Sequence, residues 1–172
     1  MSDPISIIID KLTNSIEQLS TGTHHDTVVV ILAKSDLKLT LKKNGWLFRW
    51  KDEYAQEGRE VYKLCIADDE DHKIQGLISI EVMPDHVYIH LIENAPHNRN
   101  KEDDSYIGVG GNLVAHACRR SVKEGYEGFV AMTAKTDLIH HYEKTLGAEH
   151  FKDGRMIIPD VAAQVLIKKY KL

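Results

Sequence analysis

Residues 105–113 read Ser105-Tyr106-Ile107-Gly108-Val109-Gly110-Gly111-Asn112-Leu113. The glycines follow a predicted strand at residues 86–93 and open a predicted helix at residues 106–124. A strand, a glycine-rich turn and a helix N-terminus form an anion site, because unpaired N–H groups point outward at the positive end of the helix dipole. Glycine also lets the backbone approach phosphates, since it has no Cβ. We therefore expect a phosphate-binding turn here, with a plain helix start as the alternative.

Two common nucleotide motifs do not fit this turn. A Rossmann G-x-G-x-x-G motif requires a glycine at the position of Leu113. A P-loop requires G-K-[ST], but Gly110 and Gly111 are followed by Asn112. The sequence therefore excludes both motifs and leaves open which phosphate-bearing ligand the turn holds.

The remaining sequence predicts an α+β fold. Runs of β-branched and apolar residues predict strands at residues 27–32, 46–50, 61–67, 74–82, 86–93, 129–133 and 156–158. Helices are expected at residues 5–19, 35–43, 106–124 and 136–146, and from residue 160 onward. The first rests on Ile8, Leu12, Ile16 and Leu19 at helical spacing, and the last is expected to bury Val161, Ala162, Val165 and Leu166. A meander followed by βαβα units implies a mixed sheet with helices on its faces.

Composition narrows the classes of function. A length of 172 residues fits one domain, and 42% hydrophobic with 28% charged residues is ordinary for a globular protein. A net charge of −4 argues against a nucleic-acid partner. The apolar run at residues 5–9 is too short for a signal peptide or a membrane span, so no membrane partner is expected. Cys65 and Cys118 cannot build a disulfide framework, which favours a cytoplasmic location.

At the glycine turn the sequence resembles the GNAT superfamily of N-acetyltransferases. Residues 105–110 match the signature [RQ]-x-x-G-x-[GA] at both small positions, with Ser105 in place of Arg or Gln. A second block reads Phe129-Val130-Ala131-Met132, then His141-Tyr142-Glu143-Lys144-Thr145-Leu146-Gly147-Ala148. It resembles the family's fifth strand and the helix ending in F-Y-x-K-x-G-F, with one extra residue before the glycine.

Further departures accompany this resemblance. The strand exit Ile92-Glu93-Asn94-Ala95-Pro96 resembles that of the family but is followed by an insertion at residues 100–104, and Lys135 replaces a family Asn. The resemblance covers about residues 61–158, whereas residues 1–60 match the family loosely. The whole run is also similar to a bacterial subgroup of GNAT-like proteins.

The resemblance implies a fold and a cosubstrate. The expected fold is one GNAT-like domain over residues 1–172, with a mostly antiparallel central sheet and helices on both faces. Its fourth and fifth strands are parallel and splay apart, and the pantetheine of acetyl-CoA lies in the gap. Residues 61–158 would form the CoA-binding core, while residues 1–60 would shape the acceptor pocket.

The resemblance also assigns individual residues. The backbone of Leu91, Ile92 and Glu93 would hold the pantetheine. The turn that begins at Gly108 would hold the pyrophosphate through the N–H groups of Val109, Gly110, Gly111, Asn112 and Leu113. Tyr142 would lie near the CoA sulfur and protonate the leaving thiolate. The alternative is that Tyr142 belongs to an apolar stripe with Ile139 and Leu146.

A general base is also required, because an alkylammonium group with a pKa near 10.4 is no nucleophile. The candidates are Glu93, Glu81 and His90, of which Glu93 is favoured because it ends the strand beside the expected thioester. Side chains alternate along a strand, so His90 and Glu93 are expected on opposite faces unless a bulge intervenes.

No metal site is expected among the ten histidines. The pairs His24-His25 and His140-His141 are adjacent in sequence and do not face one site, and no Cys or Asp completes a set of ligands.

The sequence thus predicts an N-acetyltransferase in which the primary amine of a small molecule or protein attacks acetyl-CoA directly. Two alternatives stay open. The chain could be a catalytically inactive module that binds acyl-CoA, or an interaction protein that dimerises through an edge strand or its terminal helices.

Overall fold

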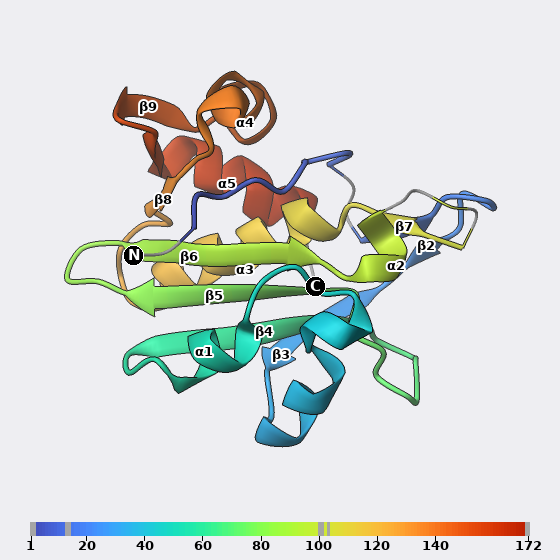
Figure 1. Ribbon diagram of the computed structural model, residues 1–172. Coiled ribbons are helices and arrows are strands. Elements are labelled where there is room, and N and C mark those ends of the chain that lie inside the picture. The colour runs from blue at the N-terminus through green and yellow to red at the C-terminus, as the bar shows by residue number, and fades with distance from the viewer. Residues whose placement is uncertain (1–2, 13–14, 100–101, 103, 171–172) are drawn as a thin grey trace.

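The computed structural model describes residues 3–12, 15–99, 102 and 104–170. Within these residues, the largest sheet has seven strands, which are β3 (Thr27–Ile31), β4 (Arg59–Ile66), β5 (Gly76–Val82), β6 (Val87–Asn94), β8 (Val130–Thr133), β9 (Glu149–Lys152) and β10 (Arg155–Ile158). Their spatial order is β3-β4-β5-β6-β8-β10-β9, and neighbours are antiparallel except for β6 and β8, which are parallel (Figure 1). This arrangement confirms the predicted α+β fold with a mostly antiparallel sheet and a parallel fourth and fifth strand.

A second, small sheet lies beside the glycine turn. It has the order β2-β1-β7, with β1 at Ile16–Gln18, β2 at His24–His25 and β7 at Tyr106–Ile107. β7 ends immediately before Gly108. Because β1 pairs with β7, the segment that precedes β3 in the sequence lies next to the glycine turn.

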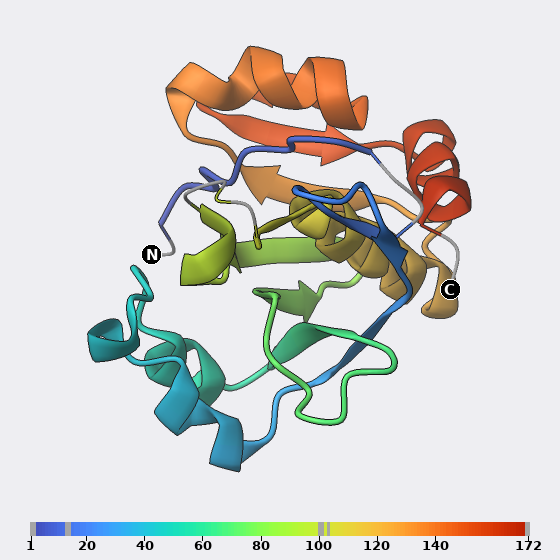
Figure 2. The ribbon, with the colours of Figure 1, turned by 90° about the vertical axis from the view of Figure 1, so that its right-hand side faces the viewer.

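Helices cover both faces of the large sheet, as the sequence predicts. One face carries α3 (Val109–Lys123), α4 (Ile139–Leu146) and α5 (Asp160–Lys169). The other carries α1 (Trp50–Ala55) and the 3-10 turns Lys34–Leu39 and Lys42–Asn44 (Figures 1 and 2). Two short elements lie in connections, α2 (Pro96–Arg99) after β6 and the 3-10 turn Thr136–Leu138 before α4.

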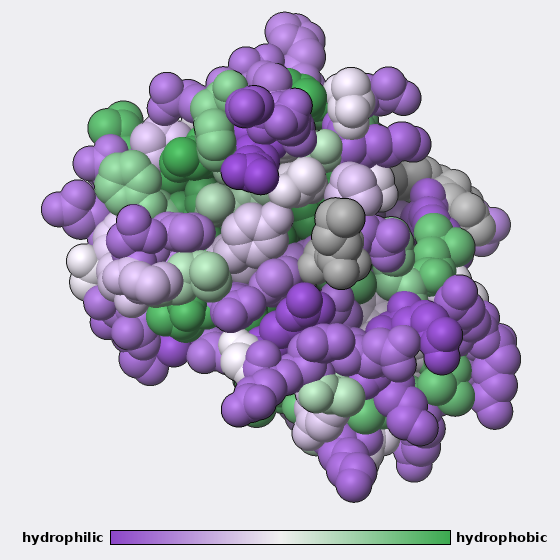
Figure 3. All heavy atoms as spheres, turned by 60° about the vertical axis from the view of Figure 1, so that its left-hand side comes forward, coloured by the Kyte–Doolittle hydropathy of each residue, from purple (hydrophilic) through white to green (hydrophobic). Residues whose placement is uncertain are grey.

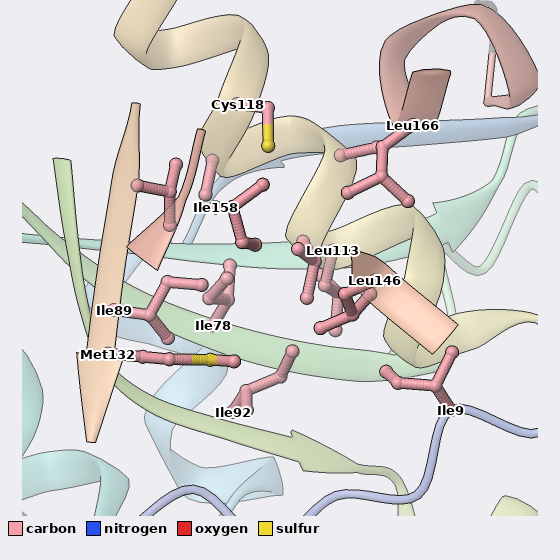
Figure 4. Packing of buried hydrophobic residues seen from close by; sticks show 14 of the residues in the cluster. Ile9, Ile78, Ile89, Ile92, Leu113, Cys118, Met132, Leu146, Ile158 and Leu166 are labelled. Atoms are coloured by element: carbon pink, nitrogen blue, oxygen red, sulfur yellow. The ribbon is translucent and has the colours of Figure 1, made fainter. Parts of the chain in front are cut away.

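The core has two parts, one on each face. Beneath α3, the inward side chains of β5, β6, β8 and β10 pack on Leu113, Cys118, Leu146 and Leu166 (Figure 4). Beneath α1, Trp46 and Trp50 pack on Leu77 and Leu91. Because side chains alternate along a strand, β5 and β6 contribute residues to both parts.

Three sequence predictions are wrong. Residues 5–12 are extended and lead into β1, because Ile5, Ile7 and Ile9 are buried at a spacing of two. Residues 46–50 are not a strand, since Trp50 instead begins α1. In α5, Val161 and Val165 are exposed, whereas Ala163 and Leu166 are buried.

On the surface, polar residues predominate, with apolar patches between them on the face drawn in Figure 3. The larger exposed apolar side chains include those of Leu47, Phe151 and Val161. None of the helices within the described residues is long and apolar enough to cross a membrane.

The contact between β5 and α3 depends on Gly76, which gives a first prediction. A Cβ on Gly76 would lie 2.6 Å from Val109 Cγ1 and 3.0 Å from Leu113 Cδ1. Gly76→Ala should therefore lower the free energy of unfolding by about 1–3 kcal/mol through overpacking. Urea denaturation would measure the loss, with the exposed Val165→Ala as a control that changes stability by less than about 0.5 kcal/mol. Equal stability of the two variants would contradict this packing.

Candidate functional site

Strands β6 and β8 part after a short ladder. Their pairing runs from Val87↔Val130 to Ile89↔Met132, and β6 then continues to Asn94 while β8 ends at Thr133. We call the space between the C-terminal half of β6 and the end of β8 the inter-strand gap.

Residues 5–10, which we call the N-terminal strap, fill the inter-strand gap. Ile5 forms a parallel bridge with Ala134. The Ile5 N–H donates to the Thr133 carbonyl at 2.7 Å, and the Lys135 N–H donates to the Ile5 carbonyl at 2.9 Å. Figures 1 and 2 both show the strap, in dark blue, running between β6 and the β8–β10 side of the sheet. The strap therefore lies in the gap like an added strand.

The glycine turn meets the other end of the strap. Gly108 adopts a φ of 93°, which favours glycine, and the helix α3 begins at the next residue. The Gly108 N–H donates to Asp10 Oδ1 at 3.0 Å, so the turn holds a carboxylate, as expected of an anion site. A Cβ on Gly110 would lie 3.1 Å from Ile9 Cδ1 and 3.2 Å from Ile7 Cδ1, so the strap covers this glycine.

The remaining turn residues serve the interior of the protein. Val109 and Leu113 are buried in the core beneath α3. The Asn112 N–H donates to the Gly108 carbonyl, and its side-chain amide donates to the carbonyls of Ser15 and Gly108. Gly111 faces the Tyr170 hydroxyl, which would lie 1.9 Å from a Cβ at this position. The N–H of Asn112 is thus already used within the helix.

A β-bulge interrupts β6 at His90. Leu91 pairs with Ser79 and Ile89 pairs with Ile80, which leaves His90 as the extra residue. Ile89 and Ile92 consequently both pack beneath α3, although they are three residues apart. The bulge is the exception under which His90 and Glu93 are not expected on opposite faces of the strand, and both lie on the face away from α3.

Glu93 holds the chain that leads into α1. Its side chain is 5% exposed. One carboxylate oxygen accepts the Leu47 N–H at 2.8 Å, and the other accepts the Phe48 N–H at 3.3 Å and the Trp50 Nε1–H at 2.8 Å. Arg99 adds a charge-assisted hydrogen bond at 3.4 Å. The carboxylate is thus surrounded by donors that fix this chain against β6.

His90 instead faces a pocket of about 920 Å³ on the α1 face of the sheet. The pocket wall comes from β4, β5, β6, β8, β9 and β10 and from the turn between β5 and β6, and it includes Arg59, Glu81, Tyr88, His90, Thr133, Phe151 and Arg155. His90 Nε2 lies 2.7 Å from Glu81 Oε1, and the hydroxyls of Tyr88 and Thr133 are 2.7 Å apart. Thr133 lines this pocket and also bonds the strap through its carbonyl, so the pocket and the inter-strand gap meet there.

Tyr142 lies on the inter-strand gap. Its side chain is buried, and its hydroxyl donates to the Ile7 carbonyl of the strap at 2.5 Å. Burial raises the pKa of Tyr142, which keeps the phenol protonated at neutral pH. Next to it, burial lowers the pKa of His141, as suits a ring nitrogen that accepts the Ile9 N–H at 2.9 Å.

The two residues that depart from the GNAT pattern have structural partners. The Ser105 hydroxyl is buried and donates to the His97 carbonyl at 2.7 Å, away from the Gly108 N–H. Lys135 bonds the strap through its backbone N–H. Across the described part of the chain, no three His, Cys, Asp or Glu side chains form a group that could hold a metal ion.

The sequence predicts Glu81 and His90 as site residues, but it predicts neither the strap nor the other residues of the pocket wall. The alternation of Ile5, Ile7 and Ile9 was the available signal for the strap, because a spacing of two indicates a strand. Tyr88 and Thr133 carry no motif, since the fold alone brings them together.

The contacts of Glu93 generate a prediction about stability. Glu93→Gln places an amide NH₂ where an oxygen now accepts backbone N–H groups, so it should cost about 1–3 kcal/mol of unfolding free energy. Urea denaturation at neutral pH would measure the loss. The exposed Glu57→Gln serves as the matched control and should stay within about 0.5 kcal/mol of the wild type. An unchanged midpoint for Glu93→Gln would show that these bonds do not stabilise the fold.

Solved structures with a similar fold were found, although no protein-family model and no curated protein sequence matches the chain. A chimera of the spermidine N-acetyltransferase SpeG from Vibrio cholerae and hSSAT aligns with a TM-score of 0.54 and 14% identity, over 81% of this chain and 98% of the other. An acetyltransferase from Trypanosoma brucei aligns with a TM-score of 0.54 and 21% identity, over 74% of this chain and 95% of the other.

A third similar structure is the ribosomal-protein-S18-alanine N-acetyltransferase from Escherichia coli. It aligns with a TM-score of 0.51 and 15% identity, over 76% of this chain and 88% of the other. These likenesses span 74–81% of this chain and show its fold. The chain has the GNAT acyl-CoA N-acyltransferase fold.

Proposed function

We propose that the chain is an N-acetyltransferase that transfers an acetyl group from acetyl-CoA to a primary amine of a small molecule or a protein. The observation that carries the proposal is that the glycine turn, the inter-strand gap and the pocket adjoin one another. The inter-strand gap begins at a turn that holds an anion and ends at Thr133, where it meets the 920 Å³ pocket. Acyl-CoA and an acceptor amine need two such neighbouring sites. One is elongated and binds an anion at its end, and the other holds the amine.

The residues around the gap fit acyl-CoA once the strap has left it. The Gly108 N–H donates to the Asp10 carboxylate, and the pyrophosphate would take the place of this carboxylate at the turn formed by Gly108–Gly111. The Thr133 carbonyl and the Lys135 N–H now bond an extended peptide, and the amide groups of pantetheine offer the same donors and acceptors. The backbone of Leu91, Ile92 and Glu93 would form the opposite wall.

The chemistry in this proposal uses two residues. The acceptor amine loses its proton to His90 and attacks the thioester carbonyl, so that a C–N bond forms and the C–S bond breaks. His90 Nε2 lies 2.7 Å from Glu81 Oε1, so this carboxylate would orient the ring and stabilise the imidazolium that forms. Tyr142, held protonated by burial, would donate a hydrogen bond and then a proton to the thiolate. His90 is favoured over Glu93 because the Glu93 carboxylate is engaged by Leu47, Phe48 and Trp50.

The pocket wall carries charges of both signs, with the carboxylates Glu81 and Asp85 beside the guanidinium groups of Arg59 and Arg155, of which Arg59 is paired with Glu53. The proposal assigns the ammonium group of the acceptor to Glu81 or Asp85, and its alkyl chain to apolar side chains such as Phe151 and Ile157. A carboxylate attracts an ammonium group, and the apolar surface suits an alkyl chain. The proposal includes a cytoplasmic location, because Cys65 and Cys118 are free and buried.

A second function is favoured by the occupied gap. If the strap never leaves, the chain is a non-catalytic member of the fold that binds no acyl-CoA. Calorimetric titration with CoA and acetyl-CoA, beside a thiol-release assay over a panel of primary amines, separates the two. Release of thiol with one class of amine supports the enzyme. Absence of both binding and release, in the wild type and in a folded variant with an opened gap, contradicts it.

The role of Tyr142 gives a kinetic prediction. Tyr142→Phe removes the proton donor and should lower kcat on the order of 10²-fold. The KM for acetyl-CoA should not rise, because the substitution also removes the hydrogen bond that holds the Ile7 carbonyl of the strap. Steady-state kinetics would measure both constants, and an unchanged kcat would remove Tyr142 from the mechanism.

The role of His90 gives a second kinetic prediction. His90→Gln keeps a donor toward Glu81 but loses the basic nitrogen, so kcat should fall by about 10²-fold or more at neutral pH. The control is His140→Gln, because the side chain of His140 is 91% exposed on α4. Full activity of His90→Gln would return the base role to Glu93 or Glu81.

A further inference from the structure

The N-terminal strap imitates an elongated ligand in three separate ways. Ile5 bonds the end of β8 like an added strand, Asp10 places a carboxylate on the Gly108 N–H, and Ile7 and Ile9 cover Gly110. Each contact is one that the proposed function assigns to the pantetheine or the pyrophosphate of acyl-CoA. Strap and acyl-CoA therefore compete for the same donors, acceptors and volume.

The side chains of the strap make the competition strong. Ile5, Ile7 and Ile9 are 3%, 7% and 4% exposed, and they join the core beneath α3. Figure 4 shows Ile9 pointing from the strap into the cluster that contains Leu113 and Leu146. Ile8, between them, is 49% exposed and points away from the core. The strap thus seals the gap on one side and meets solvent on the other.

The end of the strap is also held. The Lys11 carbonyl accepts the Tyr170 hydroxyl at 3.0 Å, and the Lys11 ammonium lies 2.6 Å from Glu17 Oε2 in β1. Both contacts lie beyond Asp10, outside the part of the strap that fills the gap. Residues 5–10 can therefore leave the gap while Lys11 keeps these contacts.

We propose that the N-terminal strap is an autoinhibitory segment that must leave the inter-strand gap before acyl-CoA binds. This inference rests on the proposed function and adds its regulation. A protein whose competent state is a small fraction of the population binds its ligand more weakly by that fraction. Disrupting the strap should consequently raise the affinity for acyl-CoA, which is the reverse of the usual effect of damaging a core.

The test compares two neighbouring substitutions with the same change in charge. Ile7→Asp places a carboxylate in the core and expels the strap, whereas Ile8→Asp places the same group in solvent. Calorimetric titration with acetyl-CoA should show about tenfold or tighter binding for Ile7→Asp than for the wild type. Ile8→Asp should bind within about twofold of the wild type, as expected of a surface change.

Hydrogen exchange gives a direct readout of the strap. The amides of Ile5, Ile9 and Lys135 should be protected in the free wild type, because each donates a hydrogen bond that exists only with the strap in place. Saturating acetyl-CoA should deprotect Ile5 and Ile9. Equal affinity of all three proteins, with Ile5 and Ile9 still protected in the complex, would overturn the inference and leave the proposed function standing. A folded Ile7→Asp variant that binds no acetyl-CoA would overturn both.

A disulfide lock covers the case in which Ile7→Asp does not fold. Ile5 and Ala134 are bridge partners, so Ile5→Cys with Ala134→Cys should close a reversible crosslink. Cys65 and Cys118 should stay out of the exchange, because burial raises their pKa values to about 11 and about 12. The oxidised protein should bind no acetyl-CoA and the reduced protein should bind it. Equal binding by both forms would overturn the inference.

Discussion

Two parallel strands at the centre of the sheet part after a short ladder, and the rest of the site follows from what the backbone at the parting requires. Buried N–H and C=O groups are almost always paired, because an unpaired group loses its bonds to water without replacing them. The Thr133 carbonyl and the Lys135 N–H stand at the end of β8, beyond the last pair with β6. A partner with the hydrogen-bonding pattern of an extended chain must lie there, and Ile5 supplies it.

The bulge at His90 has a separate effect on the same strand. By inserting one residue, it shifts the later part of β6 so that Ile92 enters the core beneath α3 while Glu93 meets Trp50 on the other face. His90 and Glu93 consequently share a face but have different surroundings. Glu93 is enclosed by backbone donors, whereas His90 faces an open pocket with Glu81 as its partner.

Much of the fold could be predicted from local patterns in the sequence. The helix start at Gly108 and the helix end at Gly147 follow from glycine at positions with positive φ. The core strands follow from β-branched runs. Residues 5–19 could not be read correctly, because Ile8 and Leu12 fit a helical spacing as well as Ile5 and Ile7 fit a strand. Tertiary structure decides between the two patterns, since the gap offers backbone partners only to an extended chain.

The candidate site was predictable only in part for the same reason. The motifs predict Gly110 and Tyr142 as site residues, and both lie on the inter-strand gap. The bulge at His90 and the donors around Glu93 come from segments distant in sequence, so no local pattern indicates them. At the turn the chain supplies a carboxylate of its own, that of Asp10, and phosphate binding there stays a prediction.

The pairing of β1 with β7 has a consequence for how such a segment acts. Glu17 and Gln18 pair with Ile107 and Tyr106, so the strap is tethered to the residues immediately before the turn that it covers. A tethered segment acts at an effective concentration on the order of millimolar, which does not change when the protein is diluted. Under the proposed autoinhibition, the fraction of molecules with an open gap is therefore independent of protein concentration.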